Sequence, residues 1–370
     1  MTGAMDLVFI GLTLSSSWGN GHATTYRALL RALDAQGHRV TFLERDVPWY
    51  ASSRDLEEPD YCRLRYYESV DELRRSYRRN IAQADAVIVG SYVPEGPAVI
   101  DAVADIADGQ FCFYDIDTPV TLAKLESGEC EYLAPPQIPL FDIYFSFTGG
   151  PTLTRLKRQY RARRAEALYC AVDPDRYAPT GEPPKWDLGY LGTYSPDRQP
   201  TLERLLIEPA RQMPERRFVV AGPQYPTSIR WPENVERIEH LPPAQHASFY
   251  SRQRYTLNVT RADMIAAGWS PSVRLFEAAA CGTPVISDAW AGLESLFGGD
   301  IHVTTRSDDV VRILSNEEDI VGRRLGSGAR ERVLARHTAQ HRARELVGYL
   351  ASPVEARTRK AEKESAGTAA

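Results

Sequence analysis

The sequence predicts an α/β protein with two doubly wound domains, each built on a parallel sheet. Its 370 residues exceed what one hydrophobic core usually serves. Short runs of Val, Ile, Phe and Tyr alternate with longer segments of helical periodicity, which is typical of βαβ units. The alternation forms two series, separated by a stretch rich in Pro and Gly. We therefore expect two Rossmann-like domains, one per series.

The first series defines an N-terminal domain over residues 1–178. Its first apolar run is expected to be a strand, because no basic region precedes it and it is too short to span a bilayer. Strands are expected at Leu7–Leu12, Arg39–Leu43, Leu64–Tyr67, Ala86–Val89, Gln110–Tyr114 and Asp142–Phe147. Helices are expected at Thr24–Ala35, Val70–Ala82, Ala98–Ala107 and Thr152–Ala165.

The second series defines a C-terminal domain over residues 179–350. The stretch between Asp173 and Lys185 concentrates residues that end helices and strands, so the boundary is expected there. A long helical segment is expected over Asp319–Leu350, followed by a disordered tail at 351–370. Strands are expected at Asp187–Leu191, Arg217–Ala221, Val235–Ile238, Tyr255–Val259, Pro284–Ser287 and Ile301–Thr304.

Charge and cysteine content indicate which partners and which cellular compartment to expect. The formal net charge is −5 and basic residues are dispersed among acidic ones, which argues against a nucleic-acid-binding protein. The five cysteines lie far apart without a Cys-x-x-Cys pair, which is typical of a reducing compartment. We therefore expect a cytoplasmic protein without a transmembrane segment.

A glycine-containing loop follows the first expected strand and opens into an amphipathic helix, SSSWGNGHATTYRALLRAL. Gly19 and Gly21 let the backbone approach a ligand, and the helix start offers unpaired N–H groups to anions or hydroxyls. The Gly-x-Gly spacing is not the dinucleotide fingerprint. His22 could orient a ligand or act as a base. A tight structural turn with a structural histidine is the open alternative.

The most informative segment is WSPSVRLFEAAACGTPVIS, from Trp269 to Ser287. A loop runs into a short helix whose N-terminal dipole can point at a phosphate. Arg274 can donate two hydrogen bonds to a diphosphate, and Glu277 can accept from ribose hydroxyls. Alternatively, Glu277 pairs locally and Arg274 is a solvated helix residue.

In this segment the chain resembles a known family. The run RLFEAAACGTPVIS is similar to the nucleotide-binding helix of GT-B glycosyltransferases, particularly the group related to the spore-maturation protein CgeB. GYLGTYSPDR, FVVAGPQYP and YTLNVTR occur in the order and spacing of that family's C-terminal domain. The resemblance is clear over Asp187 to Val303. It implies two Rossmann-like domains facing each other across a cleft, and transfer of a hexosyl group from a nucleotide diphosphate sugar with no metal cofactor.

The resemblance also assigns roles to residues of the second domain. Glu277 matches the glutamate that holds the donor ribose. The other expected donor nucleotide-binding residues are Gly192, Thr193, Arg198, Ser272 and Arg274.

At one position the sequence departs from the family pattern. Many retaining members carry a glutamate eight positions before the ribose glutamate, and here that position is Trp269. Trp269, Ser270 and Ser272 would therefore meet the donor sugar differently. Retention of anomeric configuration does not follow from the resemblance.

Two aspartates follow an apolar strand in the first domain, in FYDIDTPVTL. Asp115 and Asp117 lie where the ligand crevice of an open α/β sheet is found. An Asp-x-Asp pair also occurs as a metal site in a different glycosyltransferase fold. We favour a metal-free role, with Asp117 as an acceptor-binding group or base and Asp115 near the donor sugar or acceptor. Turn capping by both aspartates is the alternative.

A second strand–Gly–Gly–helix junction, SFTGGPTLTRL, places Gly149 and Gly150 before Pro151. Its N–H groups could contact a donor phosphate or an acceptor, or the junction could be a structural turn. The following basic run, Arg155 to Arg164, is typical of a solvated helix face, although it could attract an anionic acceptor or a lipid surface.

These observations give one leading hypothesis and three rivals. The leading hypothesis is a metal-independent glycosyltransferase with His22 and Asp117 as catalytic residues, acting on an unidentified glycan, protein, lipid or small-molecule acceptor. A sugar-nucleotide epimerase or a phosphorylase could share the architecture, because a fold alone does not choose the reaction. A non-catalytic sugar-nucleotide sensor would also fit, and Trp269 in place of the glutamate favours it.

Overall fold

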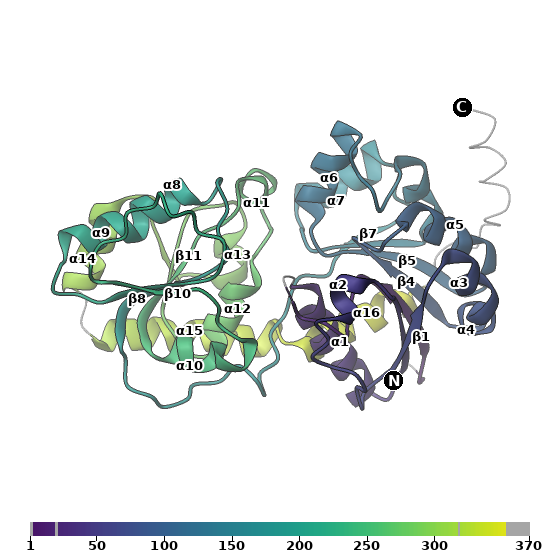
Figure 1. The fold of residues 1–370 in the computed structure, drawn as a ribbon, viewed down its shortest axis with the longest axis horizontal. Helices are drawn as coiled ribbons and strands as arrows, with labels where there is room; N and C mark the ends of the chain where they lie inside the picture. Colours follow the sequence, from purple (N-terminus) through teal and green to yellow (C-terminus); the bar gives the residue numbers. More distant parts are fainter. Residues whose placement is uncertain (1–2, 19–20, 317–318, 353–370) are drawn as a thin grey trace. The chain divides into compact units, whose positions relative to one another are not determined.

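The computed structural model describes residues 3–18, 21–316 and 319–352, which form two compact units (Figure 1). The first unit runs to Cys170 and resumes at Ala339. The second unit spans Ala171–Thr338.

The first unit is built on a seven-stranded sheet in which every pairing is parallel. The strand order is β3-β2-β1-β4-β5-β6-β7. All six strands expected from the sequence are present, and β7 is a short addition that was not foreseen. The strands are β1 (Asp6–Gly11), β2 (Arg39–Arg45), β3 (Arg63–Tyr67), β4 (Ala86–Gly90), β5 (Gln110–Asp115), β6 (Ile143–Ser146) and β7 (Ala165–Ala167).

Helices cover both faces of this sheet. Val8 and Ile10 pack into one core cluster, whereas Leu7 and Phe9 pack into the other, so alternate residues of β1 are buried on opposite faces. The helices are α1 (His22–Ala35), α2 (Pro48–Ala51), α3 (Val70–Ser76), α4 (Arg78–Gln83), α5 (Gly96–Ile106), α6 (Thr118–Ser127), α7 (Pro151–Gln159) and α16 (Ala339–Ala351), with a 3₁₀ turn at Pro135–Leu140.

The second unit is built on a six-stranded sheet, again with every pairing parallel. Its strand order is β10-β9-β8-β11-β12-β13. All six expected strands are present: β8 (Trp186–Leu191), β9 (Phe218–Ala221), β10 (Val235–Ile238), β11 (Gln253–Asn258), β12 (Val285–Ser287) and β13 (His302–Val303).

The second unit's helices also lie on both faces of its sheet (Figure 1). One face carries a core cluster in which Leu188 and Leu257 of the sheet pack against Leu205 and Leu314. The helices are α8 (Gln199–Leu202), α9 (Glu208–Gln212), α10 (His246–Ser251), α11 (Ala262–Ala267), α12 (Val273–Ala280), α13 (Leu293–Phe297), α14 (Ser307–Asn316) and α15 (Asp319–Arg336); a π-helical turn at Glu203–Ile207 joins α8 to α9, and a 3₁₀ turn at Pro243–Gln245 precedes α10.

The end of the chain differs most from the expectation. The helix expected over Asp319–Leu350 is interrupted at His337 and Thr338, where Thr338 bridges to Val172. The chain then returns to the first unit as α16, which lies against α1 (Figure 1). The domain expected over 179–350 therefore differs from the observed unit at both ends. Of the expected tail, residues 353–370 lie outside the described part of the chain.

Other helices of the first unit also depart from the sequence prediction. The helix expected over Val70–Ala82 is divided at Tyr77 into α3 and α4. The helix expected over Thr152–Ala165 ends at Gln159, and Ala165 begins β7 instead. α6 was not foreseen, although it begins directly after Asp117 and ends at Gly128, whose φ of 75° suits a glycine C-cap. In the described residues, no helix is both long and apolar enough to cross a membrane.

Both sheets reverse strand order once beside their first strand. In the first unit β2 lies on one side of β1 and β4 on the other, and β9 and β11 flank β8 in the same way in the second unit. Ligands of open α/β sheets bind beyond the carboxyl ends of the strands at such a switch point. The loops after β1, β4, β8 and β11 are therefore the expected positions of a ligand site.

Candidate functional site

The loop after β8 approaches β9 and α12 closely. A Cβ on Gly222 (φ 139°) would lie 2.1 Å from the carbonyl oxygen of Gly192, and a Cβ on Gly192 would lie 2.8 Å from Nη2 of Arg274. Glycine at both positions therefore lets backbone and guanidinium come into contact. Thr193 follows as an exposed residue at the carboxyl end of the strand.

Arg274 lies on the first turn of α12 and is 9% exposed. Its Nε donates to the carbonyl oxygen of Leu191, and its Nη1 donates to Oδ1 of Asn258 at 3.2 Å. The guanidinium also lies over the ring of Tyr190, 4.8 Å from its centroid. All three of these partners are neutral. The buried Asp288 carboxylate also interacts electrostatically with Arg274, without forming an ion pair with it.

Arg198 is held in the same way. Its Nη2 donates to the carbonyl oxygen of Thr193 at 2.6 Å, and its buried Nε has no acceptor. Burial, together with repulsion from Arg274 and Arg261, lowers the pKa of Arg198. Within the described ranges, neither Arg198 nor Arg274 forms an ion pair with a carboxylate. A group of cations with unfilled donors is suited to an anion.

The start of α12 is held by the side chain of Asn258 from β11. Oγ of Ser272, the N-cap residue, donates to Oδ1 of Asn258 at 2.8 Å, and Ser270 is 3% exposed. Trp269 has a φ of 43°, which is strained for a side chain of this size. Its ring lies over Gly292, where a Cβ would come within 2.7 Å.

Glu277 lies one turn after Arg274 and is 5% exposed. Its Oε2 accepts a hydrogen bond from Tyr250 at 3.1 Å and lies 4.0 Å from Nδ1 of His246. The imidazole in turn lies 3.3 Å from the hydroxyl oxygen of Tyr177. The carboxylate is thus oriented by a polar cluster, and its near-complete burial means that a ligand reaches only one edge of it.

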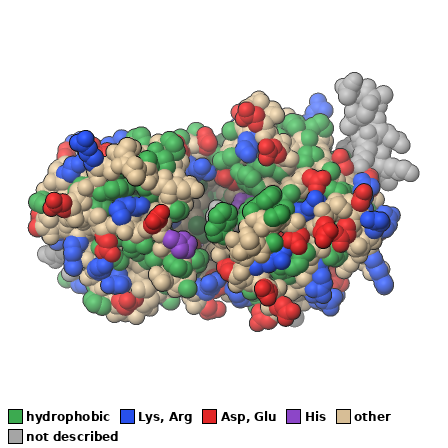
Figure 2. All heavy atoms as spheres, viewed as in Figure 1, with side chains coloured by type: hydrophobic (Ala, Val, Ile, Leu, Met, Phe, Trp, Pro, Cys, Tyr) green, Lys and Arg blue, Asp and Glu red, His purple; other side chains and the backbone are tan. Residues whose placement is uncertain are grey.

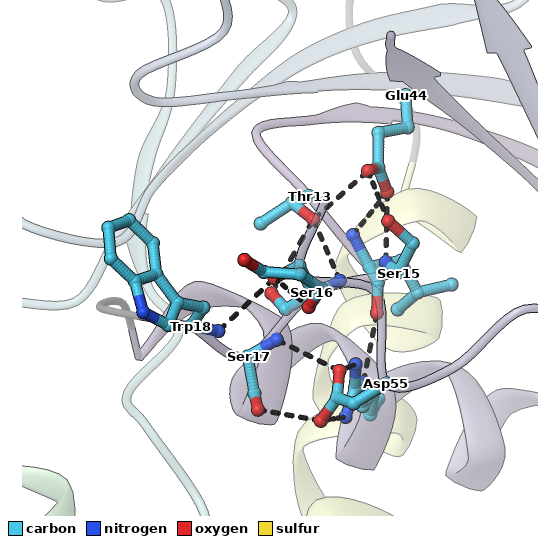
Figure 3. Close-up of polar contacts among 10 residues, drawn as sticks. Thr13, Ser15, Ser16, Ser17, Trp18, Glu44 and Asp55 are labelled. Atoms are coloured by element: carbon cyan, nitrogen blue, oxygen red, sulfur yellow. Dashed lines mark hydrogen bonds and ion pairs between the residues drawn. The ribbon is translucent and has the colours of Figure 1, made fainter. Parts of the chain in front are cut away.

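The loop after β1 is organised around a buried carboxylate (Figure 3). Glu44 of β2 is fully buried, and its Oε2 accepts from the backbone N–H groups of Leu14 and Ser15 at 2.7 and 2.9 Å. Its Oε1 accepts from the hydroxyls of Thr13 and Ser15 at 3.0 and 2.6 Å. Four hydrogen bonds therefore fix the loop, an arrangement that the sequence analysis did not foresee.

A second carboxylate holds the far end of this loop. Asp55 accepts from the backbone N–H and the hydroxyl of Ser17, and Arg27 of α1 binds both of its oxygens (Figure 3). Desolvation opposes ionisation, but the hydrogen bonds from Arg27 and Ser17 prevail and lower the pKa of Asp55 to about 2. Trp18 follows, with its indole 63% exposed and directed away from both carboxylates (Figure 3).

His22 and Asp117 lie on the same edge of the first sheet and both contact Tyr92. The His22 ring meets Tyr92 edge-on, with centroids 5.3 Å apart, and the Tyr92 hydroxyl donates to Oδ2 of Asp117 at 3.4 Å. Tyr92 follows β4 and has a φ of 63°, a strained conformation found often at functional sites. Burial lowers the pKa of His22 to about 4, so the imidazole is neutral at pH 7.

Asp115 occupies a different environment from Asp117. It is fully buried and accepts hydrogen bonds from Tyr144 at 2.6 Å and Thr121 at 2.7 Å. Burial raises its pKa to about 6, against the opposing effect of these hydrogen bonds. The backbone N–H of Asp117 donates to the same carboxylate at 3.2 Å. Asp115 therefore positions the loop and makes no surface available to a ligand.

The structure describes the surroundings of three of the other glycines predicted to lie at the site. A Cβ on Gly149 would lie 2.0 Å from the hydroxyl oxygen of Tyr169, and Gly150 has a φ of 57° before α7. Gly21 is the exposed N-cap of α1, with open space around its Cα. Gly19 lies outside the described residues.

Metal chemistry was expected to be absent. Among the residues that the structure describes, no three or more His, Cys, Asp or Glu side chains are grouped so as to hold a metal ion.

On the face shown in Figure 2, basic and acidic side chains are interspersed over both units, which suits the small net charge.

The sequence identified several of these positions and missed others. Gly192, Arg198, Arg274 and Ser272 are brought together at one end of the second sheet, as expected. Glu44 and Tyr92 were not predicted from the sequence. Glu44 is a charged residue within an apolar strand, and that pattern could have drawn attention to it. The conformation of Tyr92 leaves no trace in the sequence.

Solved structures with a similar fold include an α-glucosyltransferase in complex with UDP-glucose and DNA, with a TM-score of 0.69 and 12% identity over 95% of this chain and 100% of that one. HepE of Anabaena, in complex with UDP-glucose, has a TM-score of 0.65 and 12% identity over 94% and 100%. Sucrose-phosphate synthase of Thermosynechococcus elongatus has a TM-score of 0.64 and 15% identity over 93% and 98%. These likenesses establish the GT-B fold.

A family model matches part of the chain. Residues 198–348 match the family described as glycosyl transferase-like, a segment that includes Arg198, Arg274 and Glu277. A comparison with curated proteins found no match. The chain therefore has the GT-B fold, and its residues 198–348 are similar to the glycosyl transferase-like family. The closer likeness to the CgeB group stays a prediction.

The Glu44 network generates a stability prediction. Glu44→Ala leaves two buried N–H groups and two hydroxyls without their acceptor, so we expect a loss of about 3 kcal/mol. In Glu44→Gln, the amide oxygen can still accept from Leu14 and Ser15, and the amide nitrogen can donate to the hydroxyls, so a loss of about 1 kcal/mol is expected. Urea denaturation measures both. Equal losses would contradict the proposed hydrogen-bond pattern.

Proposed function

We propose that the chain transfers a sugar from a nucleoside diphosphate sugar to an acceptor hydroxyl without a metal ion. The observation that carries the proposal is the pair Arg198 and Arg274, two oriented guanidiniums whose hydrogen-bond partners are all neutral. A diphosphate would supply the missing negative charge. The same contacts would stabilise the diphosphate as it leaves during transfer.

The donor nucleotide would extend along α12. Arg274 and Glu277 are three residues apart, so they lie on the same side of the helix. With the diphosphate at Arg274, Glu277 is placed to accept from the ribose hydroxyls. Two of the structurally similar enzymes were solved with UDP-glucose, which makes UDP-glucose the first donor to test.

The donor sugar would lie near the loop before α12. Trp269 stands where a glutamate is found in many retaining relatives, and Ser270 and Ser272 flank the same turn. The strained backbone of Trp269 is retained by its packing on Gly292. We infer that the indole contacts the sugar through its apolar face rather than through a charge.

The acceptor would bind at the first unit, where Asp117 is the group proposed to take the acceptor proton. His22, with a pKa of about 4, is a weak proton acceptor at pH 7, so we assign it a hydrogen bond to a sugar hydroxyl. Tyr92 contacts both side chains and would fix their positions relative to each other.

Arg274→Ala and Arg198→Ala should each weaken UDP binding by more than about 1.5 kcal/mol, the scale of a charge-assisted hydrogen bond. Isothermal titration calorimetry measures the dissociation constants. Arg306→Ala is the matched control, because Arg306 is an exposed arginine of the same unit that pairs with Asp308. An unchanged dissociation constant for both site variants would remove these arginines from the donor site.

Transfer should survive chelation of divalent cations, because the groups proposed to face the diphosphate are arginines and backbone dipoles. The rate of UDP release from UDP-glucose, measured with and without EDTA, checks this. Loss of activity in EDTA, with recovery on adding Mn²⁺ or Mg²⁺, would contradict metal independence.

Asp117→Asn should lower turnover by roughly 100-fold, the usual scale for loss of a general base. His22→Ala should cost less, about tenfold, because it removes a hydrogen bond to substrate. Donor affinity should change little in either variant. Steady-state kinetics with UDP-glucose measure these effects, and wild-type turnover in Asp117→Asn would exclude Asp117 as the base.

A further inference from the structure

We propose that Tyr225 is a positioning residue of the donor site, which keeps the backbone N–H of Thr193 directed at the diphosphate. This inference rests on the proposed function and adds a hydrogen-bond donor, and the side chain that orients it, to the anion site. Three features support it: the unused N–H group of Thr193, the direction in which it points, and the hydrogen bond from Tyr225 that fixes this direction.

The N–H of Thr193 is an unused donor just after β8. It has no hydrogen-bond acceptor in the part of the chain that the structure describes. The carbonyl oxygen of the same residue accepts from Arg198 at 2.6 Å, so the group lies beside one of the cations proposed to bind the diphosphate. Thr193 is an exposed residue. Backbone N–H groups that accompany cations are suited to phosphate oxygens.

The direction of this N–H follows from the way the chain continues past β8. The N–H of Gly192 donates to the carbonyl oxygen of Ala221 at 2.9 Å. Two residues on, the N–H of Tyr194 donates to the carbonyl oxygen of Pro223 at 3.0 Å. Both groups therefore point toward β9 and the loop that follows it. Because alternate N–H groups of an extended chain point to opposite sides, that of Thr193 points toward β11, which pairs with the other side of β8.

A proline leaves a gap in this ladder of hydrogen bonds, and Tyr225 fills it. In a parallel pairing with this register, the carbonyl oxygen of Gly192 would accept from the N–H of residue 223. Pro223 has no N–H, so this carbonyl group lacks its backbone partner. The Tyr225 hydroxyl donates to it instead, at 3.0 Å. A side chain thus replaces the missing backbone donor and holds the peptide bond between Gly192 and Thr193.

The Tyr225 ring is itself held in place. The Arg237 guanidinium lies over the ring, 4.2 Å from its centroid, and donates to the carbonyl oxygens of Val220 and Gly222 at the end of β9. Trp231 meets the ring edge-on, with centroids 5.4 Å apart. Burial raises the pKa of Tyr225, so the phenol keeps its proton and remains a donor at neutral pH. An ordered ring loses little entropy in holding the carbonyl group.

Tyr225→Phe tests the inference, because it removes the hydroxyl and keeps the ring. The carbonyl group of Gly192 must then turn toward water to find a donor, and glycine permits this rotation. The N–H of Thr193 turns with it, since the peptide unit is planar. We expect UDP to bind the variant about fivefold more weakly, the scale of one hydrogen bond. The affinity for uridine, which has no phosphate, should not change. Calorimetry measures the first affinity and saturation-transfer NMR the second.

Tyr77→Phe is the matched control. The Tyr77 hydroxyl also donates to a backbone carbonyl oxygen, that of Tyr66 at 2.7 Å, but it lies in the first unit. Both variants lose one hydrogen bond between a tyrosine and a carbonyl group, so an effect of lost stability alone would appear in both. The affinity for UDP should fall only in Tyr225→Phe. An equal loss in the two variants, or an equal loss for UDP and uridine in Tyr225→Phe, would overturn the inference.

NMR of the full chain labelled with ¹⁵N-threonine observes the proposed donor itself. Thr193→Ser assigns its resonance. UDP should shift the Thr193 amide proton downfield in a saturable way, and uridine should leave it in place. In Tyr225→Phe the shift at saturation should be smaller, because the N–H is no longer held toward the ligand. A Thr193 resonance that stays unchanged while UDP is bound would contradict the proposed contact.

Calorimetry of the wild type with UDP separates this inference from the proposed function. If the wild type binds UDP and Tyr225→Phe binds it equally well, the positioning role fails and the proposed function stands. If the wild type does not bind UDP, the proposed function fails and the positioning role falls with it.

Discussion

The parallel pairing of every strand is the constraint on which the rest of the structure depends. Because all strands of a sheet point the same way, all of their following loops emerge at one edge. The reversal of strand order beside β1 and β8 then opens a gap between neighbouring loops at that edge. Trp18, His22 and Tyr92 flank the reversal in the first unit, and Gly192 and the arginines flank it in the second. This topology therefore brings polar and aromatic residues that are far apart in the sequence to the same edge of a sheet.

The carboxyl edges of the two sheets differ in how their buried charges are compensated. In the first unit, buried carboxylates are compensated by hydrogen-bond donors, so Glu44 and Asp115 stabilise loop geometry. In the second unit, Arg198 and Arg274 repel each other and their hydrogen-bond acceptors are neutral, which costs stability in the absence of ligand. Such an arrangement is retained where a bound anion offsets the repulsion. Buried carboxylates therefore fix the loop geometry at the edge of the first sheet, whereas positive charge is concentrated at the edge of the second sheet.

The sequence predicted the sheets well because parallel strands buried on both faces leave strong local signals. The proximity of Arg274 and Glu277 could also be predicted, because the two residues are close in sequence and share a helix face. Contacts between residues far apart in the sequence could not be predicted. Glu44 acts on residues about 30 positions away, and Tyr92 joins His22 to Asp117 only once three separate loops have been brought together. α6 was overlooked because two aspartates and a proline resemble a turn as closely as they resemble a helix start.

The return of α16 to the first unit has a consequence for the order in which the chain folds. Residues 171–338 form a continuous stretch, so the second unit is complete as soon as that stretch has left the ribosome. The first unit is synthesised earlier but lacks the helix whose Ala343 and Leu346 cover α1. Until α16 has left the ribosome, α1 presents an uncovered apolar stripe. The half made first is therefore finished last, and during synthesis it is the half most exposed to aggregation and chaperone capture.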